Sequence, residues 1–265
     1  MHSLHPAVSA LMRRAAAEII LPRFGQLKAD QRHEKTPGDF VTIADHESED
    51  LLTAGLLALL PDSRVLGEEA EAHDPGSIGE PGEGAVWTVD PLDGTNNFAA
   101  GHGPFAVMIG LAVNGVTEAG WILDPQSGRM CHAARGQGAF IDDTRVVAKT
   151  TGEPLPVAAI SLKFIGPERR TDIRARADGR LHLTRIPFCA GEQYPRLVLG
   201  TNDVALFERT CPWDHVPGAL FVSEAGGKVA RPDGSDYRID VPGTGLLGAA
   251  SPELWGRAVG ILFGA

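Results

Sequence analysis

Two carboxylates lie three residues apart on a segment that the sequence predicts to be a tight turn. The apolar run 85–89 is typical of a buried strand, and Asp90 follows where that strand is expected to end. Pro91 cannot donate to a sheet ladder, and Gly94 can adopt backbone angles that other residues avoid. The turn can therefore aim Asp90 and Asp93 at one point.

The residues after this turn suit a phosphate. Gly94, Thr95 and Asn96 are expected to open a helix, whose free N–H groups and positive dipole end favour an anion. Carboxylates beside an anion site make sense if a divalent cation lies between them, and hard oxygen ligands are typical of Mg²⁺. A polar turn capped by Asp93 would explain either carboxylate alone. The whole string Val89-Asp90-Pro91-Leu92-Asp93-Gly94-Thr95-Asn96-Asn97-Phe98 favours the functional interpretation.

Further acidic segments occur on both sides of this string. They are Asp39-Phe40-Val41-Thr42-Ile43-Ala44-Asp45, Gly67-Glu68-Glu69, and Trp213-Asp214-His215-Val216-Pro217-Gly218 followed by Ser223-Glu224-Ala225-Gly226-Gly227. Each has an ordinary explanation by itself. Asp45 could be a first-turn helix carboxylate, and Glu68 with Glu69 could form a surface turn.

Together these segments resemble the signatures of the inositol monophosphatase family, the Mg²⁺-dependent, lithium-sensitive sugar phosphatases. They occur in the family's order and with about its spacing, and they frame nearly the whole chain. The resemblance implies an α+β protein with the layered αβαβα sugar-phosphatase fold. It also implies a homodimer, because family members are usually dimers.

The resemblance further implies a metal site with two or three Mg²⁺ ions. One ion would be held by Glu68, Asp90 and the Leu92 carbonyl, and it would lower the pKa of its water. A second would be held by Asp90, Asp93 and Asp214, and it would stabilise the leaving oxygen. Histidines are scarce near these motifs, which favours Mg²⁺ over zinc.

The catalytic and substrate-binding roles follow from the same resemblance. Thr95 with Asp45 would orient or deprotonate the attacking water, next to the metal ligand Glu68. The N–H groups of Gly94 and Thr95 would hold the phosphate, beside Asp93.

The alcohol side of the substrate site departs from the family pattern. Many family members carry Gly-Ser-Ala where this chain has Phe188-Cys189-Ala190. Cys189 and Ala190 are therefore candidate substrate contacts. Glu208 corresponds to a family glutamate that contacts substrate hydroxyls, although it lies one residue closer to the Trp213-Asp214 pair. Lys35 corresponds to a lysine on a mobile loop near the metals.

The expected function is Mg²⁺-dependent hydrolysis of a small polyol or sugar phosphate monoester, with inositol monophosphate first. The alternatives among enzymes are a 3′(2′),5′-bisphosphate nucleotidase, a histidinol-phosphate phosphatase and a fructose-bisphosphate phosphatase. Outside enzymes, the alternative is a non-catalytic relative that binds a metal or a partner. The complete acidic set argues against that alternative, because a binding protein need not keep Glu68, Thr95 and Asp214 together.

The charge of the chain agrees with a small anionic substrate handled through cations. The net charge is −10, from 34 acidic and 24 basic residues. A nucleic-acid surface needs a basic patch, so no nucleic-acid partner is expected. An acidic protein would repel a phosphate ester unless cations intervene, which fits a metal requirement. The expected partner is a small phosphorylated metabolite.

The sequence also favours a cytoplasmic location. Cys131, Cys189 and Cys211 are widely spaced and form no C-x-x-C pair, as is usual in a reducing compartment. Residues 1–6 carry no basic stretch ahead of an apolar core, so no signal peptide is expected. No apolar run approaches the roughly 20 residues of a membrane span, and no membrane partner is expected.

The length of 265 residues suits one domain or two tightly joined lobes. The composition turns polar from Lys149 to Pro156, so we place a boundary near residue 150. Residues 1–150 would form an α+β lobe with most metal ligands. Residues 151–265 would form a smaller αβ lobe that completes the metal and substrate site.

Hydrophobic periodicity predicts the elements that position these residues. The first lobe should hold helices over 7–24 and 45–60, strands over 63–66, 85–89, 105–113, 116–124 and 129–135, an Asn114-Gly115 hairpin turn, and loops over 28–38 and 71–84. The second lobe should alternate strands over 157–163, 181–186, 204–207, 228–230 and 246–250 with helices over 167–177, 190–200, 214–225 and from Ser251 onward.

Overall fold

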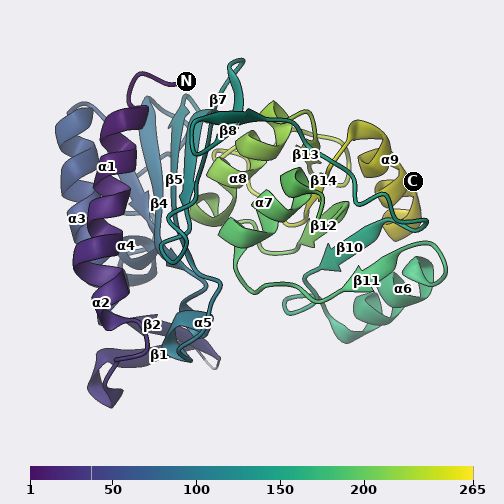
Figure 1. Cartoon of the computed structure of the whole chain (residues 1–265), viewed down its shortest axis with the longest axis horizontal. Helices are drawn as coiled ribbons and strands as arrows, with labels where there is room; N and C mark the ends of the chain where they lie inside the picture. The colour runs from purple at the N-terminus through teal and green to yellow at the C-terminus, as the bar shows by residue number, and fades with distance from the viewer. Residues whose placement is uncertain (37, 265) are drawn as a thin grey trace.

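The chain folds into alternating layers of helix and sheet (Figure 1). A computed structural model describes residues 1–36 and 38–264, so Pro37 of the predicted loop lies outside the described residues. Among the described residues, no helix combines the length and the apolar composition needed to cross a bilayer.

Five layers follow one another across the molecule. From the N-terminal side they are α1 (His5–Ala15) with α3 (Ile43–Leu59), a seven-stranded sheet, α7 (Ala190–Leu199) with α8 (Pro212–Glu224), a five-stranded sheet, and α6 (Pro167–Ala177) with α9 (Pro252–Phe263). Separate apolar cores fill the spaces on both faces of each sheet. This arrangement confirms the predicted αβαβα fold.

The larger sheet is mostly antiparallel. Its order is β3 (Arg64–Gly67), β4 (Ala85–Asp93), β5 (Ala106–Val113), β6 (Val116–Leu123), β7 (Met130–Ala134), β8 (Gly138–Ile141) and β9 (Thr144–Val146). Only β3 and β4 pair in parallel among these neighbours. The predicted hairpin turn between β5 and β6 is confirmed, because Asn114 and Gly115 both have positive φ.

The smaller sheet is mixed. Its order is β11 (His182–Thr184), β10 (Val157–Ile160), β12 (Val204–Phe207), β14 (Leu246–Ala249) and β13 (Lys228–Ala230). The first three strands run parallel and the last two pair antiparallel. The strands of the two sheets fall on either side of residue 150. The division into two lobes there stays our proposal.

The N-terminal part differs from the prediction in one place. The first helix continues from α1 through a π-helical segment, Ala16–Ile20, into α2 (Leu21–Arg23), much as expected. The predicted loop over 28–38 is wrong. A short 3₁₀ turn is followed there by β1 (Arg32–Thr36), which pairs with β2 (Asp39–Thr42). The mostly exposed, polar residues of β1 gave no apolar signal for this strand.

The loop predicted over 71–84 also starts too early. α4 (Glu68–His73) is helical, because consecutive helix-forming glutamates and alanines follow strand β3. The irregular part of the segment begins at Asp74. Glu68 and Glu69 therefore open a helix and do not form a surface turn.

Two glycines let α8 pack closely on the large sheet. A Cβ on Gly110 of β5 would lie 2.3 Å from Val216 Cγ1, and one on Gly120 of β6 would lie 2.5 Å from Pro217 Cα. The second contact is with backbone, which cannot move by rotating a side chain. Since α8 carries Asp214 in its first turn, these contacts set how near that carboxylate comes to the sheet.

Replacing Gly120 with alanine should therefore push α8 off the sheet. We expect a loss of about 1–3 kcal/mol in the free energy of unfolding, the usual cost of overpacking. Gly256→Ala is the matched control. Gly256 lies inside α9 with nothing within 4 Å of an added Cβ, so its replacement should stabilise by about 0.5–1 kcal/mol. Urea unfolding of both variants measures the difference, and a Gly120→Ala protein as stable as the parent would contradict this packing account.

A polar cluster of two histidines and an aspartate lies where the start of α1 meets β7. The rings of His5 and His132 stack with centroids 3.7 Å apart, and each ring places Nε2 within 3.5 Å of Asp143 Oδ1. Trp121 donates its indole N–H to His5 Nδ1. His5 must then carry its proton on Nε2, which it points at Asp143, so this nitrogen has no lone pair for a metal.

Burial lowers the pKa of His132 to about 4, and the neighbouring His5 adds to this effect. The folded state disfavours the charged ring. The contribution of His132 to the free energy of unfolding is therefore fully present above the unfolded pKa of about 6.5, and it is lost as the pH falls from there toward 4. His132→Gln should reduce this acid loss by about 1–3 kcal/mol. Unfolding curves at pH 7 and pH 4.5 test this, with the exposed His182→Gln as control. Parallel pH profiles for the parent and His132→Gln would count against it.

Candidate active site

Three carboxylates from distant parts of the chain meet at one point. Glu68 opens α4, Asp90 lies on β4, and Asp214 lies in the first turn of α8. Each offers an oxygen, and these oxygens lie within 4.8 Å of one another. Asp90 is almost completely buried. The structure thus brings together three of the four side chains predicted as metal ligands.

The end of β4 is shaped by a bulge. Asp90 pairs with Met108 and Asp93 with Ala106, so the strand carries one extra residue between them. Leu92 donates its N–H to Asp90 Oδ1 at 2.9 Å, which holds that carboxylate in place. The strand therefore continues to Asp93 and does not end at Asp90 as predicted.

Gly94 follows the bulge in a conformation that suits glycine. Its φ is +85°, and it precedes α5 (Thr95–Ala99). A Cβ there would also lie 2.9 Å from the carbonyl oxygen of Pro104. The predicted helix start directly after the two aspartates is confirmed.

Asp93, the fourth predicted ligand, reaches toward the second half of the chain. Its Oδ2 accepts a hydrogen bond of 2.6 Å from the Gly191 N–H, in the first turn of α7. Cys189, which precedes that helix, places its Sγ 3.7 Å from the Asp93 carbonyl oxygen. Cys189 and Ala190 thus line the cavity beside the aspartates. Their role as substrate contacts stays a prediction.

The site is electrostatically strained without a cation. Burial raises the pKa of Asp90 and of Asp214 well above the usual range, and the nearby charges of Glu68 and Asp93 raise both further. Burial also raises the pKa of Asp93 to about 6, although the Gly191 N–H works against this. Close buried carboxylates repel one another unless positive charge neutralises them.

The donor set fits a hard divalent cation. All three converging atoms are carboxylate oxygens, the ligands that Mg²⁺ prefers. The nearest histidine in sequence, His215, is held elsewhere by the Tyr194 hydroxyl at 2.7 Å and the Arg209 carbonyl at 2.9 Å. An imidazole ligand of the kind that zinc favours is therefore absent from this cluster of described residues.

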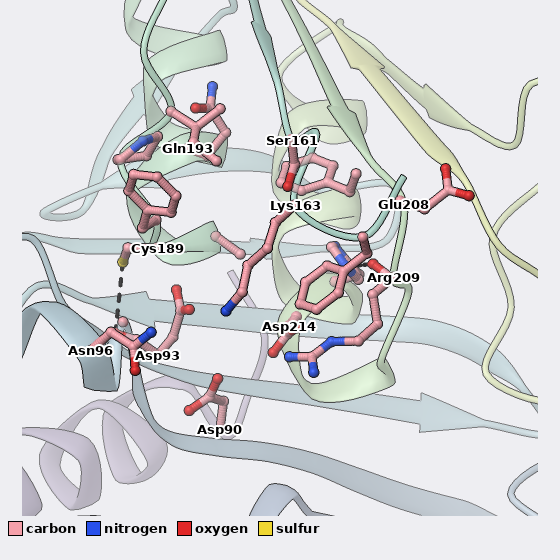
Figure 2. Close-up of a pocket in the computed structure, with 18 of the residues that line it drawn as sticks. Asp90, Asp93, Asn96, Ser161, Lys163, Cys189, Gln193, Glu208, Arg209 and Asp214 are labelled. Carbon is pink, nitrogen blue, oxygen red and sulfur yellow. Dashed lines mark hydrogen bonds between the residues drawn. The ribbon is translucent and has the colours of Figure 1, made fainter. Parts of the chain in front are cut away.

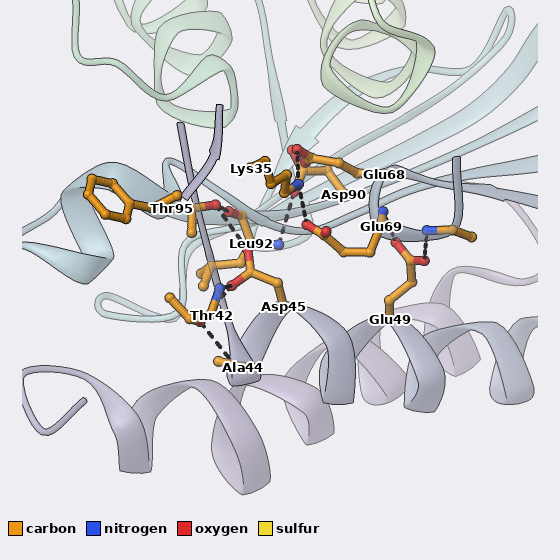
Figure 3. A network of polar contacts seen from close by, with 12 residues as sticks. Lys35, Thr42, Ala44, Asp45, Glu49, Glu68, Glu69, Asp90, Leu92 and Thr95 are labelled. Carbon is orange, nitrogen blue, oxygen red and sulfur yellow. Dashed lines mark hydrogen bonds and ion pairs between the residues drawn. The ribbon is translucent and has the colours of Figure 1, made fainter. Parts of the chain in front are cut away.

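Asp45 and Thr95 form a hydrogen-bonded pair beside the Leu92 carbonyl (Figure 3). The Thr95 hydroxyl lies 3.0 Å from Asp45 Oδ1 and 2.8 Å from the Leu92 carbonyl. Thr42 caps α3 and donates to the same carboxylate through its N–H and its hydroxyl. Burial raises the pKa of Asp45 to about 7 against the lowering effect of the Thr42 hydrogen bonds. Asp45 is thus both a capping residue and a partner of Thr95.

Lys35 comes to the site from β1. Its ammonium lies 3.0 Å from Glu68 Oε1 and 2.7 Å from Glu69 Oε1 (Figure 3). Burial disfavours the charged lysine, but Glu68 and Glu69 outweigh burial and raise the pKa of Lys35. Lys35 therefore lies beside Glu68, one of the predicted metal ligands, and its role in binding substrate stays a prediction.

Glu49 is a buried carboxylate that belongs to none of the sequence motifs. It accepts hydrogen bonds from the N–H groups of Glu69 and Ala70, at 2.9 and 2.8 Å, and so caps α4. Its position four residues after Asp45 on α3 would have placed it on the same helix face. Glu49 therefore fixes the helix that presents Glu68.

A cavity opens beside the carboxylates, between the two sheets (Figure 2). Lys163 and Arg209 extend into it from the second half of the chain. The apolar pattern predicts a strand over 157–163, and neither cation belongs to a motif that predicts a role for it. The strand in fact ends at Ile160, which leaves Lys163 on a loop. The only sequence feature that indicates a positively charged region here is the excess of basic residues after position 163 in an otherwise acidic chain.

Glu208 is less well placed than predicted. It borders the cavity, but its carboxylate pairs with Arg169 at 2.8 Å and points away from the aspartates (Figure 2). Its role as a substrate contact stays a prediction.

Comparisons with known proteins agree over nearly the whole chain. Residues 2–260 match the profile described as Inositol monophosphatase family. Inositol-1-monophosphatase of Bacillus subtilis is 30% identical over 229 residues, which cover 85% of this chain and 84% of that protein. Histidinol-phosphatase of Chlorobaculum parvum is 30% identical over 88% of this chain and 87% of its own.

Two further comparisons extend the picture. A protein named putative Nus factor SuhB, from Neisseria meningitidis, is 27% identical over 94% of both chains. The solved structure of the Thermotoga maritima IMPase TM1415 has a TM-score of 0.79 at 23% identity and covers 100% of this chain and 99% of its own. At that identity the match supports the fold.

The repulsion among the carboxylates predicts that the parent and an Asp90→Asn variant differ in opposite directions in stability without metal and in stabilisation by metal. Asp90→Asn removes one of the mutually repelling charges, so at pH 8 without metal the variant should be more stable than the parent. We expect a rise in Tm of about 2–4 °C or more, which corresponds to about 1 kcal/mol in a chain of this size. Added Mg²⁺ should stabilise the parent and have little effect on the variant. Thermal unfolding with EDTA and with Mg²⁺ measures both, and an Asp90→Asn protein less stable than the parent in EDTA would oppose this account.

Proposed function

Because this chain belongs to the inositol monophosphatase family, it is a phosphatase of that superfamily, and we propose that it hydrolyses a small polyol or sugar phosphate monoester with Mg²⁺. Inositol monophosphate is the first candidate substrate. The observation that carries the proposal is the convergence of Glu68, Asp90 and Asp214 beside the start of α5. Carboxylates on one side and backbone N–H groups on the other suit a phosphate bound through cations.

The proposed metal ligands are divided between two positions, with two or three ions in all. Glu68, Asp90 and the Leu92 carbonyl would hold one ion, and Asp90, Asp93 and Asp214 would hold another. A bound Mg²⁺ supplies positive charge that offsets the charge of the phosphate and activates water for attack.

The protein's own groups then orient the reactants. The Thr95 hydroxyl can donate its proton to Asp45, which lies 3.0 Å away, and its lone pairs are then free to accept from the attacking water. Asp45, whose pKa burial raises to about 7, is suited to take up a proton near neutral pH. The first N–H groups of α5, next to Gly94 and Thr95, would hold the phosphate oxygens.

Other substrates, and a role outside catalysis, are alternatives to the proposed function. A bisphosphate nucleotide, histidinol phosphate and fructose bisphosphate are the alternative substrates, and a non-catalytic relative that binds a metal or a partner is the alternative outside enzymes. We further propose a cytoplasmic homodimer that acts on a small phosphorylated metabolite, without a nucleic-acid or membrane partner.

A phosphate-release panel with Mg²⁺, with and without Li⁺, tests the function. Inositol 1-phosphate should release phosphate, and Li⁺ should reduce the rate. Absence of release from every ester would favour the non-catalytic alternative.

Asp93→Asn should reduce kcat/KM by at least about 100-fold, because it removes a charge from the proposed metal site. The asparagine oxygen can still accept from Gly191, so the fold should persist. Asp233→Asn, on an exposed turn, removes the same charge far from the site and should leave activity unchanged. Near-normal turnover by a folded Asp93→Asn protein would refute the assignment.

A further inference from the structure

The loop between β10 and α6 carries a cation and an aromatic ring over the site. Lys163 and Phe164 both border the cavity beside the carboxylates, and Phe164 is 48% exposed. The Lys163 ammonium lies 5.2 Å from the centre of the Phe164 ring, and the Arg209 guanidinium carbon lies 4.8 Å from the same centre. Two like charges are thus gathered about one ring that borders the cavity.

This loop is held in shape by α6. Arg170 donates from Nη2 to the Lys163 carbonyl at 2.9 Å and from Nε to the Ile165 carbonyl at 2.5 Å. The Ser161 N–H donates to the Leu206 carbonyl of β12 at 2.9 Å. The backbone under Lys163 is therefore fixed before a substrate binds, which lowers the entropy lost when that side chain is used.

The Lys163 side chain extends into the cavity toward the aspartates (Figure 2). Its ammonium reaches the Gly38 carbonyl at 3.4 Å, and in the described part of the chain no ion pair within 4.0 Å ties it to a carboxylate. A neutral carbonyl compensates only part of an ammonium charge. This differs from Lys35, whose two glutamates lie at hydrogen-bond distance. Lys163 is therefore available to an anionic ligand.

The surroundings of Lys163 are positive although the protein is acidic. Residues 163–185 hold seven basic and three acidic residues, in a chain of net charge −10. A shallow groove next to the cavity shares Lys163 and Phe188 with it and is lined by Arg170, Arg174 and Arg185. Phe188 is 50% exposed and has a φ of +55°, an unusual conformation for a bulky residue. The alcohol end of the site therefore combines positive charge with exposed aromatic rings.

We propose that Lys163 and Arg209, arranged around Phe164, bind a second anionic group on the substrate's alcohol. The inference rests on the proposed phosphatase function and deepens it. Among the candidate substrates of the proposed phosphatase, the bisphosphates are then preferred, and inositol monophosphate, as the ester of a neutral alcohol, is hydrolysed less efficiently. The same positive charge disfavours an amino alcohol such as histidinol, because its ammonium group would be repelled.

Matched substrate pairs isolate the second phosphate. We would measure kcat/KM for adenosine 3′,5′-bisphosphate against adenosine 3′-phosphate, and for fructose 1,6-bisphosphate against fructose 1-phosphate, with Mg²⁺. The preference for the bisphosphate should be about 10- to 100-fold in at least one pair, since hydrogen bonds to charged groups are the strong ones. The pair with the larger ratio tells whether a nucleoside or a sugar carries the second phosphate.

The variants test whether these two cations cause the preference. Lys163→Met and Arg209→Gln should each reduce the ratio of the two kcat/KM values at least about fivefold, while Lys163→Arg keeps it. Lys149→Met is the matched control, because Lys149 is exposed and borders neither the cavity nor the groove. It removes the same charge and should leave the ratio unchanged.

Three results would overturn the inference. The parent could lack the preference, the ratio could survive Lys163→Met and Arg209→Gln, or Lys149→Met could lower it as much, which would indicate long-range attraction alone. An equal loss for both members of a pair would mean that Lys163 binds the cleaved phosphate. These failures differ from a failure of the proposed function, in which no ester of either pair releases phosphate.

Discussion

The repulsion among buried carboxylates is the constraint on which this structure depends. Glu68, Asp90 and Asp214 point oxygens at one small volume, where burial and the neighbouring charges raise the pKa of Asp90 and of Asp214. Part of the charge is compensated by the protein, since Lys35 pairs with Glu68 and a backbone N–H binds Asp90. The remainder calls for a cation. A site that stays strained until a cation enters couples folding stability to metal binding.

The fold meets this constraint by joining its two sheets through the helices between them. α8 lies against the large sheet where Gly110 and Gly120 let it approach, and it delivers Asp214. α7 binds Asp93 through the Gly191 N–H. The carboxylates of the first half of the chain therefore meet Asp214 and the Gly191 N–H of the second half only when both helices pack. The same packing brings Lys163 and Arg209 to the cavity that the carboxylates border (Figure 2).

Much of the fold and of the acidic cluster could be predicted from the sequence. Apolar strands and the string around Asp90 are strong local signals, because glycine and proline there have few alternatives. The pairing of β1 with β2 could not be predicted, since the polar residues of β1 are mostly exposed and carry no burial pattern. The cations of the cavity were missed for another reason. The positions of Lys163 and Arg209 depend on contacts with Phe164 and on the loop that Arg170 holds. Residue spacing in the sequence does not predict such contacts.

Locating a bound cation would test the central claim most directly. Mn²⁺ can replace Mg²⁺ at oxygen sites and scatters X-rays anomalously, so crystals soaked in Mn²⁺ with phosphate would reveal its position. The account predicts anomalous density at two positions, one within bonding distance of Glu68 and Asp90 and the other within bonding distance of Asp90 and Asp214. Crystals with no density there, or with density only beside His5, His132 and Asp143, would contradict it.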